Sequence, residues 1–136
     1  MGSILLVQAD PMTSDSWVAA LTEAGHSVIT AILTREVVPV LREGGIDVVV
    51  IDAYDPRNGI VELAHSIDAL PDPPPIVLIS DSPLAPEISA RIGAAAFLAK
   101  PCEPRELVIE TNRLMGSQPP VRLMEDDPTG KSRTRI

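Results

Sequence analysis

Five short aliphatic runs divide the chain, and they constrain its fold more than any other feature. They are SILLVQ (3–8), HSVITAI (26–32), IDVVVID (46–52), PIVLIS (75–80) and AAFLAK (95–100). Four of the five are almost continuously apolar, which is typical of strands buried on both faces. A segment with the apolar spacing of a helix follows each run. This alternation of strand and helix predicts one parallel sheet with right-handed crossovers.

The segments with helical spacing carry their own start and stop signals. They are expected at 14–26, 34–45, 59–70, 86–93 and 103–115. In the first, Trp17, Leu21 and Ala24 share one face, and the glycine that follows supplies a stop signal. Pro39 falls inside the second segment, where it removes a helical hydrogen bond. That helix is therefore either kinked or begins late.

The composition indicates a single core and argues against several classes of partner. The chain has 136 residues, 45% of them hydrophobic, with one Trp, one Tyr and one Phe, so Val, Ile, Leu and Ala must fill the core. A net charge of -8 repels a polyanion, which argues against direct binding of nucleic acid and favours protein partners. No apolar run is long enough to cross a membrane.

Cysteine content and the end of the chain bear on location and domain organisation. The single cysteine, Cys102, excludes an internal disulfide, and a cytoplasmic location is the expectation. Residues 1–115 are expected to form the domain. Residues 116–136 lose all periodicity and are rich in Pro, Ser, Gly and mixed charge, so we interpret them as a disordered tail or linker.

Polar residues end four of the five expected strands. They are Gln8, Asp52, Ser80 and Lys100. The carboxyl ends of parallel strands meet at one edge of the sheet, which is where such folds bind ligands. A carboxylate, a hydroxyl and an ammonium group would form a small anion-handling site there, and a lysine beside an aspartate favours the ionised carboxylate. For each residue alone, a polar cap on a strand end remains the alternative.

Four landmarks in order give the chain a family resemblance. They are ILLVQADP (4–11), VVVIDAYDP (48–56), IVLISDS (76–82) and FLAKP (97–101). Over residues 3 to about 115 the chain resembles the receiver domain of bacterial response regulators, the signal-transduction modules of two-component systems and phosphorelays. The resemblance implies an α/β fold: a flavodoxin-like three-layer sandwich with a five-stranded parallel sheet in the order 2-1-3-4-5 and helices on both faces.

The resemblance also implies roles for individual residues. Asp52 would be the phosphoacceptor, Ser80 would hydrogen-bond the phosphoryl group, and Lys100 would pair with it. Ser80 and Phe97 would be the switch residues, with Phe97 rotating as Ser80 moves. The Lys100–Pro101 peptide bond would be cis, a form that only proline makes accessible at low cost.

The sequence departs from the family where two acidic residues usually hold Mg²⁺ together with the phosphoacceptor. Gln8 and Ala9 occupy those positions, and Ala9 has no ligand atom. We therefore expect Mg²⁺ binding to be weakened. Asp10 either replaces the missing ligand or caps the following helix, where Pro11 suits the first turn. The backbone carbonyl of Tyr54 matches the main-chain metal ligand of the family.

These features lead to a non-enzymatic function, with self-phosphorylation from a phosphodonor as the only chemistry. The expected partners are a histidine kinase or phosphotransfer protein and a downstream protein, bound through helix 86–93, strand 95–99 and helix 103–115. Pro83 and Pro86 stiffen the loop before that face, which favours weak or absent phosphorylation and a receiver that acts mainly through protein–protein interaction. One alternative is a pseudo-receiver scaffold that is independent of phosphorylation.

Two other classes of function remain as alternatives. A flavodoxin-like cofactor binder would share the fold, but the segment after the first strand lacks phosphate-binding glycines, and 2% aromatic residues leave little to stack on a flavin. A hydrolase needs a base near its nucleophile, and neither His26 nor His65 is expected near the carboxyl edge. For both histidines we expect a structural or surface role.

Overall fold

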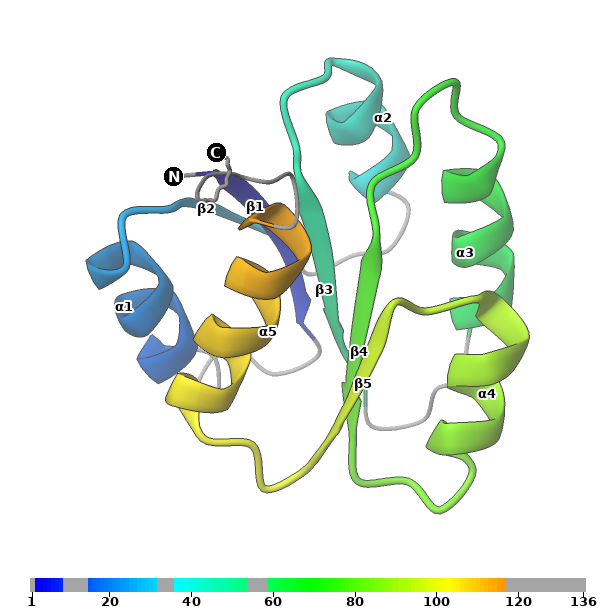
Figure 1. The fold of residues 1–136 in the computed structure, drawn as a ribbon. Helices are drawn as coiled ribbons and strands as arrows, with labels where there is room; N and C mark the ends of the chain where they lie inside the picture. Colours follow the sequence, from blue (N-terminus) through cyan, green and yellow to red (C-terminus); the bar gives the residue numbers. More distant parts are fainter. Residues whose placement is uncertain (1, 9–14, 32–35, 54–58, 117–136) are drawn as a thin grey trace, which may run out of the picture.

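The computed structural model describes residues 2–8, 15–31, 36–53 and 59–116, and it shows three layers with a parallel sheet in the middle (Figure 1). The strands are β1 Ser3–Gln8, β2 Ser27–Ala31, β3 Val48–Asp52, β4 Ile76–Ser80 and β5 Ala96–Ala99. Their order in the sheet is β2-β1-β3-β4-β5, and all four pairings are parallel. The predicted fold and strand order are confirmed.

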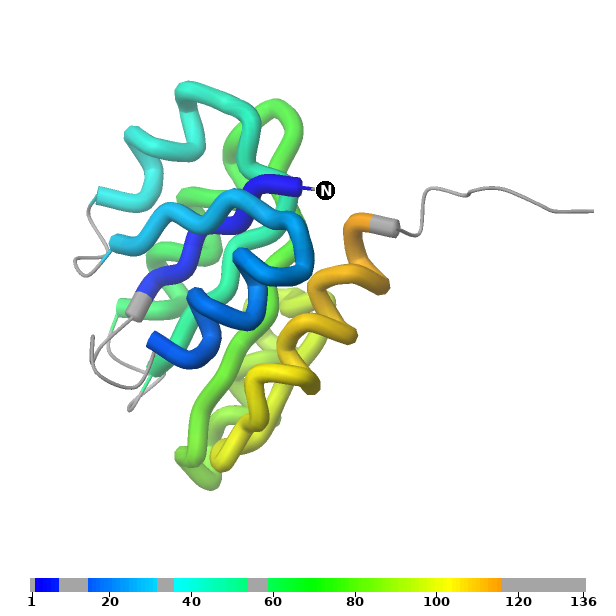
Figure 2. Tube along the Cα trace, turned by 90° about the vertical axis from the view of Figure 1, so that its left-hand side faces the viewer, coloured from blue at the N-terminus to red at the C-terminus, as the bar shows by residue number. Residues whose placement is uncertain are grey.

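Helices cover both faces of this sheet. Within the described residues they are α1 Asp15–Glu23, α2 Val37–Arg42, α3 Ile60–Asp68, α4 Ala85–Ile92 and α5 Pro104–Gly116. Helices α1 and α5 pack side by side on one face, and the other three helices cover the opposite face (Figures 1 and 2). No helix in this part of the chain is long and apolar enough to cross a membrane.

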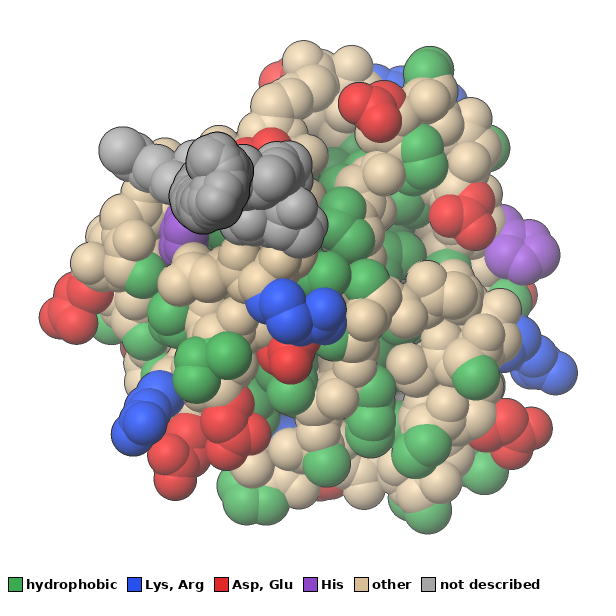
Figure 3. Space-filling view, viewed as in Figure 1, with side chains coloured by type: hydrophobic (Ala, Val, Ile, Leu, Met, Phe, Trp, Pro, Cys, Tyr) green, Lys and Arg blue, Asp and Glu red, His purple; other side chains and the backbone are tan. Residues whose placement is uncertain are grey.

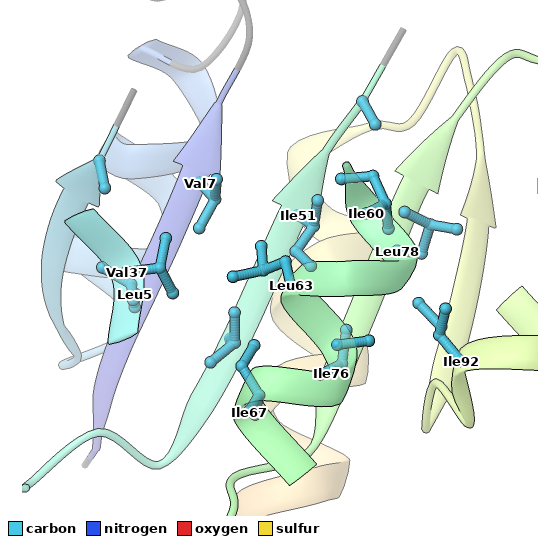
Figure 4. Packing of buried hydrophobic residues seen from close by; sticks show 14 of the residues in the cluster. Leu5, Val7, Val37, Ile51, Ile60, Leu63, Ile67, Ile76, Leu78 and Ile92 are labelled. Atoms are coloured by element: carbon cyan, nitrogen blue, oxygen red, sulfur yellow. The ribbon is translucent and has the colours of Figure 1, made fainter. Parts of the chain in front are cut away.

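Alternate residues of the strands form two separate cores, one on each side of the sheet. Leu5, Ile51 and Leu78 pack under α2, α3 and α4, in the cluster drawn in Figure 4. Val50, Ile79 and their neighbours pack under Trp17 and Leu107 of α1 and α5. Every residue of β3 and β4 is buried, as continuous apolar runs predict for central strands. In β2, by contrast, Ile29 is exposed, because this strand lies at the sheet edge.

The helix boundaries differ from the sequence prediction at two informative places. Helix α2 begins only at Val37, so Pro39 lies in its first turn, where no backbone N–H is needed, and the late start replaces a kink. Helix α1 ends at Glu23, two residues before the predicted stop signal at Gly25. Ala24 therefore lies beyond the helix and is exposed, so the prediction that it faces inward was wrong. Gly25 follows with a φ of 97°, a conformation that suits a helix stop.

The predicted domain boundary falls at the end of α5. This helix continues through Gly116, one residue beyond the predicted end of the domain at residue 115. The prediction that the rest of the chain is a tail or linker concerns residues outside the described part. Gly93, with a φ of 70°, ends α4, where the left-handed conformation favours glycine.

Candidate functional site

Three of the predicted site residues lie at the carboxyl edge of the sheet, the edge from which α4 and α5 begin (Figure 1). Asp52 is the last residue of β3 and Ser80 the last of β4, and Lys100 directly follows β5. Gln8 pairs in register with Asp52 across β1 and β3, so its backbone is at the same edge. The parallel arrangement of the strands places all these strand ends together.

Asp52 and Lys100 form a short ion pair at this edge. The Lys100 Nζ atom lies 2.7 Å from Asp52 Oδ1, and the side chains are 16% and 1% exposed, respectively. A carboxylate buried to this degree would be costly without a charged or hydrogen-bonding partner. The Lys100–Pro101 bond is cis. The backbone N–H of Lys100 donates a hydrogen bond to the Ser80 carbonyl at 3.1 Å. The end of β5 is thereby fixed against the end of β4.

Ser80 connects the edge of the sheet to the start of α4. Its buried hydroxyl accepts a hydrogen bond from Ser82 N–H at 3.1 Å. The Ser82 hydroxyl in turn accepts from Leu84 N–H at 3.2 Å, and the Ser82 carbonyl accepts from Ala85 N–H at 3.1 Å. Sequence reasoning did not identify Ser82, although two hydroxyls spaced two residues apart are a known signal for such local turns.

Phe97 is half-buried on β5, on the side of the sheet that α4 covers. It is in register with Leu78, and it packs against the apolar cluster that contains Ile88 and Ile92 of α4. Side chains two residues apart on a strand point to the same face, so Ser80 continues the face of Leu78. Ser80 and Phe97 therefore lie on the α4 side of the sheet. By the same alternation, Asp52 continues the face of Val50, on the side of α1 and α5.

The described residues offer only part of a metal site. They contain no group of three or more His, Cys, Asp or Glu side chains that could hold an ion. Asp52 is the buried carboxylate at this edge, and Asp81, the next acid along β4, is exposed. Ala9, Asp10 and Tyr54 lie outside the described residues, as does the side chain of Gln8. The described residues do not make a Mg²⁺ site by themselves, because Mg²⁺ needs several oxygen ligands.

Cys102 lies close to the site but is poorly suited to be a nucleophile. Its backbone carbonyl accepts a hydrogen bond from Trp17 Nε1–H at 3.1 Å, which ties α1 to the segment before α5. Burial, and to a lesser degree nearby carboxylates with Glu106 first among them, raise the pKa of its thiol from 9.0 to about 11. The reactive thiolate is therefore scarce near neutral pH.

The two histidines lie away from the carboxyl edge that carries Asp52, Ser80 and Lys100. His26 is buried and bonds to Gly2, at the start of β1 and thus at the opposite edge of the sheet. His65 is exposed on α3. Neither supplies a base beside Asp52 or Ser80, so the described residues give no support to a hydrolase.

Surface features do not point to a second chemical site. A cleft of about 730 Å³ lies at the amino edge of the sheet, between the loops after α2 and α3, where Gly45, Leu70 and Pro74 are among its lining residues. The described residues visible in Figure 3 carry Lys and Arg side chains that are separated from one another and interspersed with acidic ones. That face has no continuous basic patch of the kind that nucleic-acid binding uses.

Comparison with known proteins identifies relatives of the whole described unit. The family model for the response regulator receiver domain matches residues 4–112. A search of curated proteins found no significant match. Since the family that matches is that of receivers, a flavin-binding function finds no support here.

Several solved structures share the fold over most of the chain. The signal receiver domain of a signal transduction histidine kinase from Syntrophus aciditrophicus is 25% identical, with a TM-score of 0.75, and the match covers 87% of this chain and 92% of that one. The non-phosphorylated HemR receiver domain from Leptospira biflexa is 25% identical, with a TM-score of 0.72, covering 88% of this chain and 98% of that one. A response regulator from Desulfuromonas acetoxidans is 22% identical, with a TM-score of 0.75, covering 88% and 100%.

Proposed function

The chain belongs to the response regulator receiver domain family, and on this premise we propose that Asp52 is its phosphoacceptor and that its Mg²⁺ site is weakened. It is a receiver of two-component signalling and not an enzyme beyond its own phosphorylation. In our proposal it acts chiefly by binding other proteins, and residues 1–115 are the receiver unit. Its cytoplasmic location stays a prediction.

The ion pair between Asp52 and Lys100 is the observation that carries this proposal. The Asp52 carboxylate lies at the carboxyl edge of the sheet, 2.7 Å from the Lys100 ammonium group. The buried Ser80 is at the end of the neighbouring strand. A carboxylate needs such a cation nearby to receive a phosphoryl group, because the product concentrates negative charge at one point. A structural ion pair alone would not require a buried hydroxyl on the adjacent strand end.

The chemistry follows from the groups present. An Asp52 carboxylate oxygen attacks the phosphorus of a phosphohistidine or a small phosphodonor, and the bond from phosphorus to the donor atom breaks in line. The leaving group takes its proton from solvent. Lys100 balances the charge on the phosphoryl oxygens, and the Ser80 hydroxyl turns from Ser82 to donate to one of them. Positioning and charge neutralisation supply most of the catalysis.

The proposed weakness of the Mg²⁺ site comes from the residues after β1. Gln8 offers a neutral amide oxygen and Ala9 offers no ligand, where receivers place two carboxylates. Asp52, the backbone carbonyl of Tyr54 and, as a substitute, Asp10 would hold the ion, which supplies positive charge to the transferring group. Losing both usual carboxylates should weaken binding of the metal by roughly tenfold or more.

The signal would leave the site through the hydrogen bonds of the loop 81–84. If Ser80 turns toward a phosphoryl group, Ser82 N–H loses its acceptor, and the start of α4 must adjust. Phe97, on the same face, would move with Ser80. The surface of α4, β5 and α5 would then bind the downstream protein, while a histidine kinase or phosphotransfer protein would supply the phosphoryl group.

A second candidate is a pseudo-receiver scaffold in which Asp52 is never phosphorylated. Restricted backbone favours it, since Pro83 precedes α4 and Pro86 lies in the first turn of α4. In this case the Asp52–Lys100 pair would serve only to fix β3 against β5, and the face of α4, β5 and α5 would bind its partner constitutively.

A phosphorylation assay separates the two candidates. We expect incubation with Mg²⁺ and a small phosphodonor to add one phosphoryl group, measured by intact mass, because Asp52 and Lys100 are already paired at the edge. Asp52→Asn should abolish the addition. Asp81→Asn, which changes an exposed acid one residue beyond Ser80, should leave it unchanged and serves as the matched control.

A further arm tests the proposed defect. Ala9→Asp should raise the rate of phosphorylation at limiting Mg²⁺ by roughly tenfold, since it restores one carboxylate. A folded chain that takes up no phosphoryl group in either form supports the scaffold. A chain that is phosphorylated equally well with and without the new acid contradicts the weakened site, while Asp52 remains the phosphoacceptor.

A further inference from the structure

A partly buried polar bridge lies at the amino edge of the sheet, opposite the Asp52 site. Its centre is His26, which is 7% exposed. His26 Nδ1 accepts a hydrogen bond from Gly2 N–H at 3.1 Å. On the other side of the ring, Nε2 lies 2.6 Å from Asn112 Oδ1 of α5. Residues far apart in the chain thus meet on one imidazole.

The partners of the ring fix its protonation state. The backbone amide of Gly2 can only donate, so Nδ1 must be without a proton. In a neutral imidazole the single N–H is then on Nε2, where it donates to Asn112 Oδ1. A second proton would have to bind Nδ1. It would then face the Gly2 N–H, so that two donors would oppose each other and this hydrogen bond would be lost. The bridge is therefore compatible only with an uncharged His26.

The bridge ties several elements together. His26 follows α1 and its N–H donates to the Leu21 carbonyl at 3.1 Å, while Ser27 at the start of β2 donates to the Gly2 carbonyl at 2.8 Å. Met115 packs against the same place, since a Cβ added at Gly2 would overlap its sulfur. The bridge consequently holds the last turns of α5 against the starts of β1 and β2.

Among the described residues, the charged groups around this ring have other hydrogen-bond or ion-pair partners or are exposed. Asp47, before β3, lies near Gly2, but its Oδ2 accepts from Ser3 N–H at 2.8 Å. On α5, Glu110 pairs with Arg113 at 2.7 Å. On α1, the last residue, Glu23, is exposed, and β2 contains no titratable side chain.

We propose that His26 is a proton-sensitive latch: the neutral ring clamps the C-terminal turns of α5 to the amino edge of the sheet, and protonation releases them. The released segment would be the part of α5 around Asn112, while the sheet and α3 stay intact. Helix α5 belongs to the proposed output face, so an effect of acid on partner binding would rest on the proposed function. The latch itself does not depend on phosphorylation.

Nitrogen NMR of the imidazole rings tests the latch directly. The chain has two histidines, so His65→Gln leaves His26 as the only signal, and the substitution is on the exposed face of α3. We expect His26 to be in the Nε2–H form near neutral pH. We expect protection of α5 amides around Asn112 from hydrogen exchange to fall by roughly fivefold between about pH 7.5 and about pH 5.5, with α3 amides unchanged.

Two variants sharpen the test. His26→Gln, which cannot gain a proton, should make the protection of α5 independent of pH over this range. Asn112→Asp places a carboxylate on Nε2–H, which favours the charged ring, so the protection of α5 should begin to fall at a higher pH than in the parent chain. If His26→Gln does not fold, the position of the proton on the His26 ring of the parent chain near neutral pH still tests the latch.

Two results would overturn the latch. One is a His26 ring with its proton on Nδ1 near neutral pH. The other is an acid-induced loss of α5 protection that is the same in His26→Gln as in the parent chain. All these readouts use the unphosphorylated protein, so a failure of phosphorylation at Asp52 would leave the latch standing, and a failed latch would leave Asp52 untouched.

Discussion

At the scale of single residues, the buried charge of Asp52 makes the strongest demand on its surroundings. Desolvating a carboxylate costs several kcal/mol, and the attraction of a close cation offsets this only when geometry is good. Lys100 meets that condition at 2.7 Å. Cys102 shows the opposite outcome, since it has no cation in its described contacts, and burial together with the carboxylates around it keeps its thiol protonated.

Cys102 should accordingly resist alkylation in the native protein. The pKa of its thiol is raised from 9.0 to about 11, so near pH 8 the thiolate should be about hundredfold scarcer than in an unfolded chain. Labelling by iodoacetamide, followed by mass spectrometry, should be slow in buffer, faster as the pH rises toward 11, and fast in urea. Equal labelling rates in buffer and in urea at one pH would contradict this.

At the scale of elements, α5 shows how one helix divides its residues between core and solvent. Leu107 lies on the face of α5 that packs against the sheet, and it is fully buried in the cluster with Trp17. Ile109, two positions further on, is 56% exposed, because two positions carry a residue to a different face of a helix. Leu107 therefore faces the core and Ile109 faces solvent.

These two positions make a matched pair of substitutions. Leu107→Ala should lower the free energy of unfolding by about 2–5 kcal/mol, since it removes buried methyl groups and leaves a cavity. Ile109→Ala should change it by less than about 1 kcal/mol, since its side chain is largely in water. Urea denaturation followed by circular dichroism measures both. A similar loss at the two positions would mean that α5 does not pack on the sheet through this face.

At the scale of the whole molecule, one sheet joins two cores. Each central strand gives alternate residues to the cluster under α1 and α5 and to the cluster under α2, α3 and α4. If one layer of helices unfolded, the strands beneath it would be exposed to water. The same strands supply the other cluster, so that cluster would be disrupted too. The two faces should therefore unfold together, as small single domains usually do.

The chain's single tryptophan allows a test of this cooperativity. Trp17 is buried between α1 and the sheet, and it hydrogen-bonds to Cys102, so its fluorescence reports on one face only. Far-ultraviolet circular dichroism reports on all the helices. We expect the two signals to give the same midpoint and slope in urea at neutral pH. A fluorescence transition that precedes the loss of helix would show that the α1–α5 layer unfolds separately.

Most of the fold could be predicted from the sequence because the signals are local. Aliphatic runs of strand length mark β3 and β4 to within two residues, and glycines mark the ends of α1 and α4. The error at Ala24 came from giving its helical spacing more weight than the glycine that follows it. Ala24 has helical spacing, yet it is exposed, because Gly25 and the hydrogen bond from His26 N–H to the Leu21 carbonyl end the helix earlier.

The candidate site was predictable in its residue types and only partly in its contacts. The polar residues at strand ends indicated an edge with Asp52, Ser80 and Lys100, and the order of the strands follows from the family. The role of Ser82 as acceptor for the start of α4 was not predicted, since a hydroxyl in a loop has many possible partners. The roles assigned to Asp52, Ser80, Phe97 and the metal ligands stay predictions.

The sequence by itself determined where strands and helices form, since hydrophobic period and turn residues act over a few positions. Only the tertiary structure decided which other distant groups meet, such as His26 with Asn112, 86 positions away. Such pairs depend on how crossovers bring strand ends and helix ends together, and their stability comes from burial, which exists only once the chain has packed.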